Sequence, residues 1–278
     1  MENYLLLIDC PDEKGLVHKI TGILYRYELN VIRNDEFVEK EINHFFMRTE
    51  FTGNINELLI LNELYAILPK NASVKFVKKH KKNVVILVTK EHHCLGELLL
   101  RHQFNELNVN ILAVIGNYDI LADLTQKFGI PYHHISHENK SREDHELEVL
   151  RKIQDYNPEF LVLAKYMRVL TPAFVNYFPN RIINIHHSFL PAFIGANPYR
   201  QAYERGVKII GATAHFVSNH LDEGPIISQS VIPVDHTQNA NDMTQAGRDV
   251  EKIVLARSLK LVFDDCVFVC GNKTIIFD

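Results

Sequence analysis

The sequence lacks the features that mark several large classes of protein. No apolar run among its 278 residues approaches the roughly 20 residues that a membrane-spanning helix needs. The start, MENYLLLIDCPDEKG, reaches an acidic residue within a few positions and has neither the basic beginning nor the small-residue cleavage site of a signal peptide. We therefore expect a cytosolic protein with no membrane partner.

Cysteine is scarce and the charges nearly balance. Four cysteines are too few and too scattered for a disulfide framework, and we expect reduced thiols. A formal net charge of −4 gives no reason to expect a nucleic-acid partner. The one basic run, KKHKK at 78–82, is short, and we interpret it as a solvated linker.

The first 80 residues predict a small domain of their own. Within the first helical segment, Leu16, Ile20 and Ile23 recur at helical spacing. The second helical segment has Asn54 as its expected N-cap. The order strand, helix, strand, strand, helix, strand is typical of the ferredoxin-like βαββαβ fold. The expected strands are 4–10, 30–39, 44–51 and 72–79, and the expected helices are 15–28 and 54–68.

Residues 83–278 predict a second domain in which strands and helices alternate. Alternation of this kind indicates an α/β fold with a doubly wound, mostly parallel, Rossmann-like sheet. Such sheets bind ligands at the carboxyl ends of their strands. Ser141 followed by Asp144 has the spacing of a helix cap. The expected strands are 83–90, 108–117, 131–136, 160–166 and 181–186, and the expected helices are 94–106, 141–156, 171–178 and 241–263.

Two adjacent histidines stand at the end of one buried strand. In RIINIHHSFLP, alternation puts Asn184 and His186 on one face of the strand, with Ile185 and His187 pointing the other way. Pro191 then stops the strand. Paired imidazoles can be metal ligands, acid–base catalysts or packed core residues, and the strand alone leaves these readings open.

Two other segments of this domain carry polar residues at strand ends. Asp222 and Glu223 precede a Gly-Pro turn, and by itself this loop is equally consistent with a plain polar hairpin. In AKYMRVLTPAF a strand end meets a helix opened by Thr171 and Pro172.

Most of the fifteen histidines carry no recognisable ligand spacing. Neither EHHC (91–94) nor YHHISH (132–137) has a matching second half, so we expect no metal site. We interpret His215, on a later strand, as a packing or supporting residue without a direct role.

The motifs around these residues resemble a known family. NIHHSFLP, followed by LDEGPII, resembles the folate-dependent formyltransferase superfamily, whose pattern is Asn-x-His, Ser-x-Leu-Pro and a later Asp ahead of Glu-Gly-Pro. The similarity runs from about residue 83 to the C-terminus. DCPDEKGLV (9–17) and the elements around it resemble an ACT domain, a module that binds small amino acids. The two domains in this order are characteristic of the superfamily's deformylase members.

The resemblance implies a reaction and its residues. Those members hydrolyse 10-formyltetrahydrofolate to tetrahydrofolate and formate, which supplies formate for purine synthesis and balances one-carbon pools. It implies Asn184 and a protonated His186 as oxyanion donors, and Asp222 as the group that orients or deprotonates water. Folate substrate and water are then the only reactants, with no cofactor. It also implies a substrate-binding set of Met167, Arg168, Val169, Leu170, His220, Leu221 and Glu223.

Two departures from the family's transferases favour hydrolysis. Glycinamide ribonucleotide formyltransferases open their first strand–helix turn with a glycine-rich phosphate loop, which cradles phosphate on backbone N–H groups. Here that turn reads TKEHHC, with bulky side chains from Lys90 to His93, so we expect water as the acceptor. His187 stands where many formyltransferases have proline, and the deformylase members share it.

The N-terminal domain suggests regulation. Asp12, Gly15 and Leu16 lie where a strand meets a helix N-terminus, a favourable place for an amino-acid carboxylate. We expect an effector such as glycine or methionine there, at an interface between ACT sheets of a homo-oligomer. Two other functions stay open: a formyltransferase to a small amine, and an amino-acid sensor whose catalytic domain is inactive.

Overall fold

The chain forms two compact units. The computed structural model describes residues 3–192 and 198–278. One unit comprises Met1–His80 with Ile275–Asp278, and the other comprises Lys81–Thr274. The sequence-based division ended the second domain at residue 278, whereas the contacts group the last four residues with the first unit. No helix in the described ranges is both long and apolar enough to cross a membrane.

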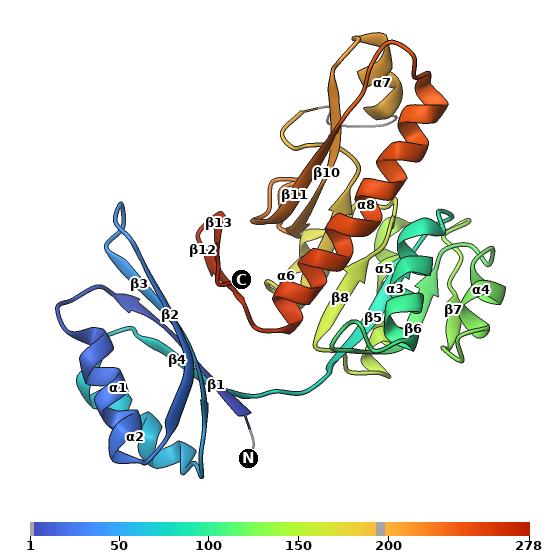
Figure 1. Cartoon of the computed structure of the whole chain (residues 1–278). Coiled ribbons are helices and arrows are strands. Elements are labelled where there is room, and N and C mark those ends of the chain that lie inside the picture. The colour runs from blue at the N-terminus through green and yellow to red at the C-terminus, as the bar shows by residue number, and fades with distance from the viewer. Residues whose placement is uncertain (1–2, 193–197) are drawn as a thin grey trace. The chain divides into compact units, whose positions relative to one another are not determined.

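The first unit is a four-stranded antiparallel sheet with two helices. Its strands lie in the order β2-β3-β1-β4, and α1 and α2 pack on one face around a single apolar core (Figure 1). The predicted ferredoxin-like fold is confirmed. The elements are β1 (Asn3–Pro11), α1 (Leu16–Arg26), β2 (Asn30–Glu39), β3 (His44–Thr52), α2 (Glu57–Ile67) and β4 (Ser73–Lys78).

The predicted cap of α2 was wrong by two residues. Asn56, not Asn54, is the N-cap, and its side-chain oxygen accepts a hydrogen bond from the Leu59 amide at 3.3 Å. A cap must stand directly before the first helical turn to reach its free N–H groups. From the sequence alone, Asn54 and Asn56 are equally suitable as the N-cap until the position of the first helical turn is known.

The second unit is a seven-stranded mixed sheet in the order β11-β10-β9-β8-β5-β6-β7. The five strands from β9 to β7 are parallel, and β10 runs antiparallel to both of its neighbours, β9 and β11. The strands are β5 (Lys82–Val88), β6 (Val109–Gly116), β7 (Tyr132–His134), β8 (Phe160–Leu163), β9 (Ile182–His186), β10 (Ile209–Phe216) and β11 (Ile226–Pro233). The predicted doubly wound, mostly parallel sheet is confirmed.

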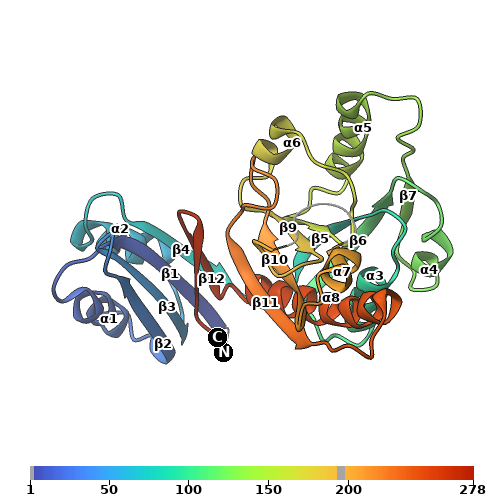
Figure 2. The same cartoon turned by 90° about the horizontal axis from the view of Figure 1, so that it is seen from above.

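Helices cover both faces of this sheet. Helices α3 and α8 lie on one face, and α5 and α6 lie on the other (Figure 2). Apolar residues of each pair share a buried cluster with the face that the pair covers. The chain crosses from one side of β5 to the other between β7 and β8, which creates a topological switch point at the β5–β8 boundary. The remaining elements are α3 (His93–Gln103), α4 (Ala122–Gln126), α5 (Arg142–Gln154), α6 (Pro172–Tyr177), α7 (Pro198–Glu204), α8 (Ala240–Phe263), β12 (Val267–Cys270) and β13 (Lys273–Ile276).

Local signals located the helix starts of this unit well. The Ser141 hydroxyl accepts a hydrogen bond from the Asp144 amide at 3.0 Å, as its spacing predicted. The interpretation of residues 78–82 as a solvated linker was wrong for the last of them, Lys82. Lys82 begins β5, is buried, and its Nζ lies 3.0 Å from Oδ2 of Asp265.

Candidate active site

A cavity of about 410 Å³ lies at the carboxyl ends of β8 and β9. Asn184, His186 and Asp222 all line it, as do His220 and Leu221 and the whole predicted segment from Met167 to Leu170. Glu223, also predicted to bind substrate, is exposed and is not among the lining residues. The turn directs Asp222 inward and its neighbour outward. Nine further lining residues were not predicted from the sequence as part of the site: Leu163, Lys165, Tyr166, Ile185, His187, His215, Val217, Ser218 and Asn219.

Asn184 is oriented by His215. The two residues face each other across the antiparallel pair β9–β10, and the Asn184 amide donates to Nε2 of His215 at 3.2 Å. The other ring nitrogen, Nδ1, donates to the Phe216 carbonyl at 2.9 Å, which sets the tautomer. Burial lowers the pKa of His215, so the ring is neutral. Asn184 keeps a second amide hydrogen for a ligand, and His215 acts through Asn184.

His186 and Asp222 form a pair. Nδ1 of His186 donates to Oδ1 of Asp222 across 3.3 Å. Burial opposes ionisation of Asp222, but the hydrogen bond from His186 and the neighbouring imidazoles outweigh it and hold the pKa of the carboxyl below its usual value. Nε2 of His186 is buried and has no hydrogen-bond partner among the described residues. This nitrogen is thus free to donate to a substrate atom.

The loop that carries Asp222 is bent back against the end of β10. Asp222 itself has a φ of 57°, in the left-handed region that non-glycine residues seldom occupy. A side chain at Gly224 would stand 1.8 Å from the Phe216 carbonyl oxygen, so only glycine permits this approach. The Gly-Pro pair therefore brings the carboxylate to the strand end, and the plain hairpin reading does not describe this loop.

Strand alternation predicted that His187 points away from the site, and this prediction was wrong. Its ring stacks on that of His186, with centroids 4.9 Å apart and planes at 26°. The reason is that β9 ends at His186, and beyond the strand alternation no longer applies. His187 lines the same cavity. Burial, and then the charge of Lys165, lowers the pKa of His187 to about 4.

The segment from Met167 to Leu170 is anchored by hydrogen bonds at its two ends. The Met167 amide donates to the Thr89 hydroxyl at 2.9 Å, and the Thr171 amide donates to the Glu146 carboxylate at 2.9 Å. Between these anchors, residues 168–170 make no backbone hydrogen bond within the described part of the chain. Their N–H and C=O groups are available to a ligand.

The turn after the histidines is tied to β10. The Thr213 hydroxyl accepts from the Leu190 amide at 3.1 Å and donates to the Ser188 carbonyl at 2.9 Å. These bonds fix the backbone of the Ser-x-Leu-Pro turn against β10. Residues 193–197, which follow the turn, lie outside the described part of the chain.

Comparison with known proteins finds a separate family match in each unit. Residues 82–259 match the formyl transferase family and residues 4–68 match the ACT domain family. The formyltetrahydrofolate deformylase of Haemophilus influenzae is 56% identical over 276 residues, covering 99% of both chains, and that of Escherichia coli K12 is 55% identical over the same share. This chain belongs to the formyltetrahydrofolate deformylase family.

Solved structures separate the deformylases from the transferases. The formyltetrahydrofolate deformylase of Pseudomonas syringae covers all of this chain, and 95% of its own length is matched, with a TM-score of 0.95 and 37% identity. Glycinamide ribonucleotide transformylase 1 from Symbiobacterium toebii covers 76% of this chain and is matched over its whole length, with a TM-score of 0.69 and 27% identity. The deformylase family thus accounts for both units, as the sequence predicted.

A second cavity of about 270 Å³ adjoins the first and shares Lys165, Met167 and His187 with it. Its other lining residues are Glu91, His93, Tyr199, Arg200, Thr244, Arg248 and Glu251. The residues that replace the phosphate loop of the transferases, Glu91 and His93, therefore stand in its wall. Sequence reasoning did not predict this cavity.

Glu251 of α8 is the buried centre of that wall. Its carboxylate accepts from Nε2 of His93 at 2.7 Å and from the Tyr199 hydroxyl at 2.6 Å, and lies 3.1 Å from Nζ of Lys165. The sequence did contain a signal that Glu251 is buried. Glu251 is one turn from Gly247 and Leu255, both buried, so a charge stands on the apolar face of an amphipathic helix.

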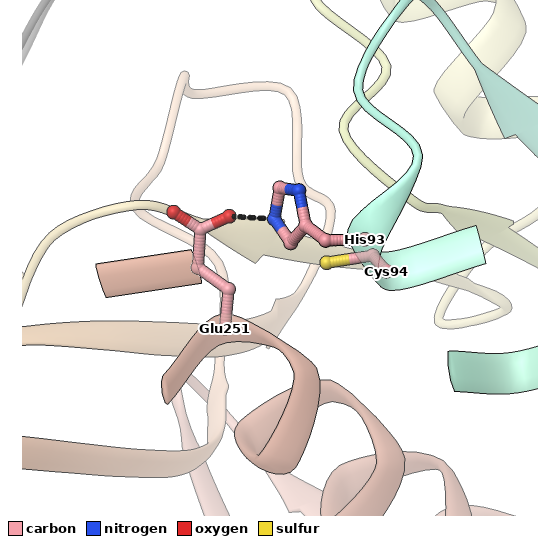
Figure 3. Close-up of side chains that lie close together, drawn as sticks. All are labelled: His93, Cys94 and Glu251. Carbon is pink, nitrogen blue, oxygen red and sulfur yellow. Dashed lines mark hydrogen bonds and ion pairs between the residues drawn. The ribbon is translucent and has the colours of Figure 1, made fainter. Parts of the chain in front are cut away.

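His93, Cys94 and Glu251 bring three possible metal-ligand atoms within 4.8 Å of one another (Figure 3). The donor set fits a hydrogen-bonded network better than a cation site. Lys165 already supplies positive charge to the carboxylate, and burial raises the pKa of the Cys94 thiol well above its usual value, so it stays protonated.

In the ACT unit, the predicted effector residues meet at the start of α1. Gly15 precedes the helix with a φ of 85°, and the Asp12 amide donates to the Asn43 carbonyl at 2.8 Å. The Leu16 side chain is buried in the core, so only its backbone can meet an effector. The geometry leaves the effector site a prediction.

Proposed function

We propose that this chain hydrolyses 10-formyltetrahydrofolate to tetrahydrofolate and formate through Asn184, His186 and Asp222. Family membership supports the reaction. The residue assignment rests on the observation that all three side chains line one cavity. The two that would bind the oxyanion each have an unused group: Asn184 has a second amide hydrogen, and His186 has Nε2.

The cavity suits a flat heterocycle with polar edges. The unpaired backbone groups of 168–170 offer donors and acceptors to a pterin ring. Met167 and Leu221, which are exposed and line the cavity, offer apolar contact to the faces of the ring. With the pterin held there, the formyl group on N10 would reach the three polar residues.

In the first step, a water oxygen adds to the formyl carbon. The C=O π electrons move to the formyl oxygen, which becomes an oxyanion. Asn184 donates its second amide hydrogen to that oxygen, and protonated His186 donates from Nε2. A donor of this kind is worth about 10²–10³ in rate. The carboxylate of Asp222 stabilises the imidazolium through Nδ1.

In the second step, a proton moves from the water to N10. Asp222 is ionised at neutral pH because its pKa is lowered, so it can accept the proton and pass it on. Acid–base help of this kind contributes about 10²–10⁴ in rate. The C–N10 bond then breaks as the oxyanion returns its electrons to the carbon, and the bonding pair stays on the protonated N10. Tetrahydrofolate and formic acid leave, and the acid releases its remaining proton to solvent to become formate. No cofactor takes part in this scheme.

Regulation, assembly and location are further parts of the proposal. The ACT domain supports an amino-acid effector, and glycine and methionine remain the candidates. A homo-oligomer joined through ACT sheets and a cytosolic location follow from the sequence arguments alone.

One assay tests the proposal against both alternatives. The pure protein is incubated with 10-formyltetrahydrofolate alone, and formate is measured. Release without an added acceptor supports hydrolysis. Release only with an amine would mean a transferase, and no release under either condition would mean a sensor.

A further inference from the structure

His187 stands where the two cavities meet. It is the only histidine that lines both of them among the described residues. One side of its ring lies against His186, and the Tyr199 ring of the second cavity is 6.4 Å away by centroid. Within the described ranges, neither ring nitrogen hydrogen-bonds to a protein group, so the imidazole is free to bind a small molecule.

The ring is a hydrogen-bond acceptor at neutral pH. Burial and the nearby Lys165 charge keep His187 unprotonated. A neutral imidazole offers one lone pair and one N–H. A residue of this kind, beside His186, can accept a hydrogen bond from water without competing for the oxyanion.

The residues that line the second cavity suit water better than a phosphorylated ligand. Each of the three cations that line it in the described part of the chain is paired: Lys165 with Glu251 at 3.1 Å, Arg248 with Glu91 at 2.8 Å, and Arg200 with Glu204 at 2.9 Å. None is left unneutralised to hold a phosphorylated acceptor. The polar wall nevertheless favours water, which needs two to four polar partners.

We propose that His187 is a further catalytic residue, which accepts a hydrogen bond from the attacking water, and that this water reaches the formyl carbon from the second cavity. The inference rests on the proposed hydrolysis. One water hydrogen points to His187 and stays on the oxygen, and the other is the proton that Asp222 takes in the second step, after the O–C bond has formed. His187 keeps its own protons, and nothing is oxidised or reduced.

The test compares His187→Leu, His187→Gln and the control His134→Leu, which alters an exposed histidine outside both cavities. For His187→Leu we expect kcat for formate release to fall about 10²-fold, in the range of lost general catalysis, with KM changed less than about threefold. His187→Gln keeps an acceptor oxygen and should recover part of the loss. The control should match the unaltered protein.

Hydroxylamine separates water positioning from a structural role. It is a stronger nucleophile that depends less on being held, so the ratio of formohydroxamate to formate should rise at least about tenfold in His187→Leu. A parallel fall of both products, a rise in KM alone, or unchanged kcat would overturn the inference. If His187→Leu unfolds at assay temperature, His187→Gln carries the same ratio test. Failure of the unaltered protein to release formate would instead reject the proposed hydrolysis.

Discussion

Nδ1 of His186 lies 3.3 Å from Oδ1 of Asp222, and this contact joins the end of β9 to the loop beyond β10. The hydrogen bond from His186, together with the neighbouring imidazoles, outweighs burial and lowers the pKa of the Asp222 carboxyl. Asp222 is therefore a carboxylate at neutral pH, and it lies directly beside the imidazole that donates to it.

Replacing Asp222 should abolish most turnover and leave the fold intact. Asp222→Asn keeps the size of the side chain but cannot accept a proton, so we expect kcat to fall by about 10²–10⁴. Steady-state formate release and circular dichroism measure the two effects. Asp155→Asn, an exposed aspartate of the same unit, is the control. Turnover of Asp222→Asn near that of the control would remove Asp222 from its role.

Replacing Asn184 should affect turnover far more than substrate binding. Asn184→Ala removes one oxyanion donor, so we expect kcat to fall by about 10²–10³ with a small change in KM. Asn184→Asp should be worse, because its carboxylate repels the developing negative charge. Asn241→Ala, at an exposed position of α8, should be neutral. A KM effect without a kcat effect would assign Asn184 to ground-state binding.

The Glu251 network should make stability depend on acid. Burial opposes ionisation, but the hydrogen bond from His93 and the charge of Lys165 outweigh it and lower the pKa of Glu251 from 4.5 to about 2. Because the folded pKa lies below the unfolded one, the stabilisation is complete above about pH 4.5 and is lost as the pH falls toward 2.

Glu251→Gln tests this dependence. At pH 7 we expect a loss of about 3–5 kcal/mol in the free energy of unfolding, since Lys165 is left buried without its partner charge. Urea denaturation should show the difference shrinking as the pH falls from 4.5 to about 2.5. The exposed Glu204→Gln should cost less than about 1 kcal/mol. A difference that grows with acid would contradict the assignment.

Gly15 and Gly22 make a matched pair in the ACT unit. Gly15 has a φ of 85°, so Gly15→Ala should destabilise by about 1–2 kcal/mol. Gly22 lies inside α1 with no atom near its missing side chain, so Gly22→Ala should stabilise by about 0.5–1 kcal/mol. Thermal unfolding measures both, and equal signs would contradict the helix-start geometry.

An effector at this helix start should be detectable by ligand-dependent stability. Glycine or methionine should raise the unfolding temperature of the unaltered protein and of Gly22→Ala, and should have a smaller effect on Gly15→Ala. Formate release with and without each amino acid gives the sign of regulation. If neither compound changes activity or unfolding temperature, the effector proposal fails.

Local patterns of the sequence determined the fold class of both units and part of the site. Helical spacing and alternation predicted both folds, and the spacing of Ser141 and Asp144 located a helix start. Alternation placed Asn184 and His186 on one face, because both belong to one strand. These features depend on residues a few positions apart, so their geometry follows from the backbone period alone.

Only the tertiary structure decided how the site is completed. Strand order brings Asp222 to His186 and His215 to Asn184, and no local period contains that order. The end of β9 turns His187 back onto His186, against the alternation that had separated them. The meeting of α8 with the turn before α3 places Glu251 beside His93 and builds the second cavity. Such contacts join distant segments, and packing of the whole sheet and its helices sets them.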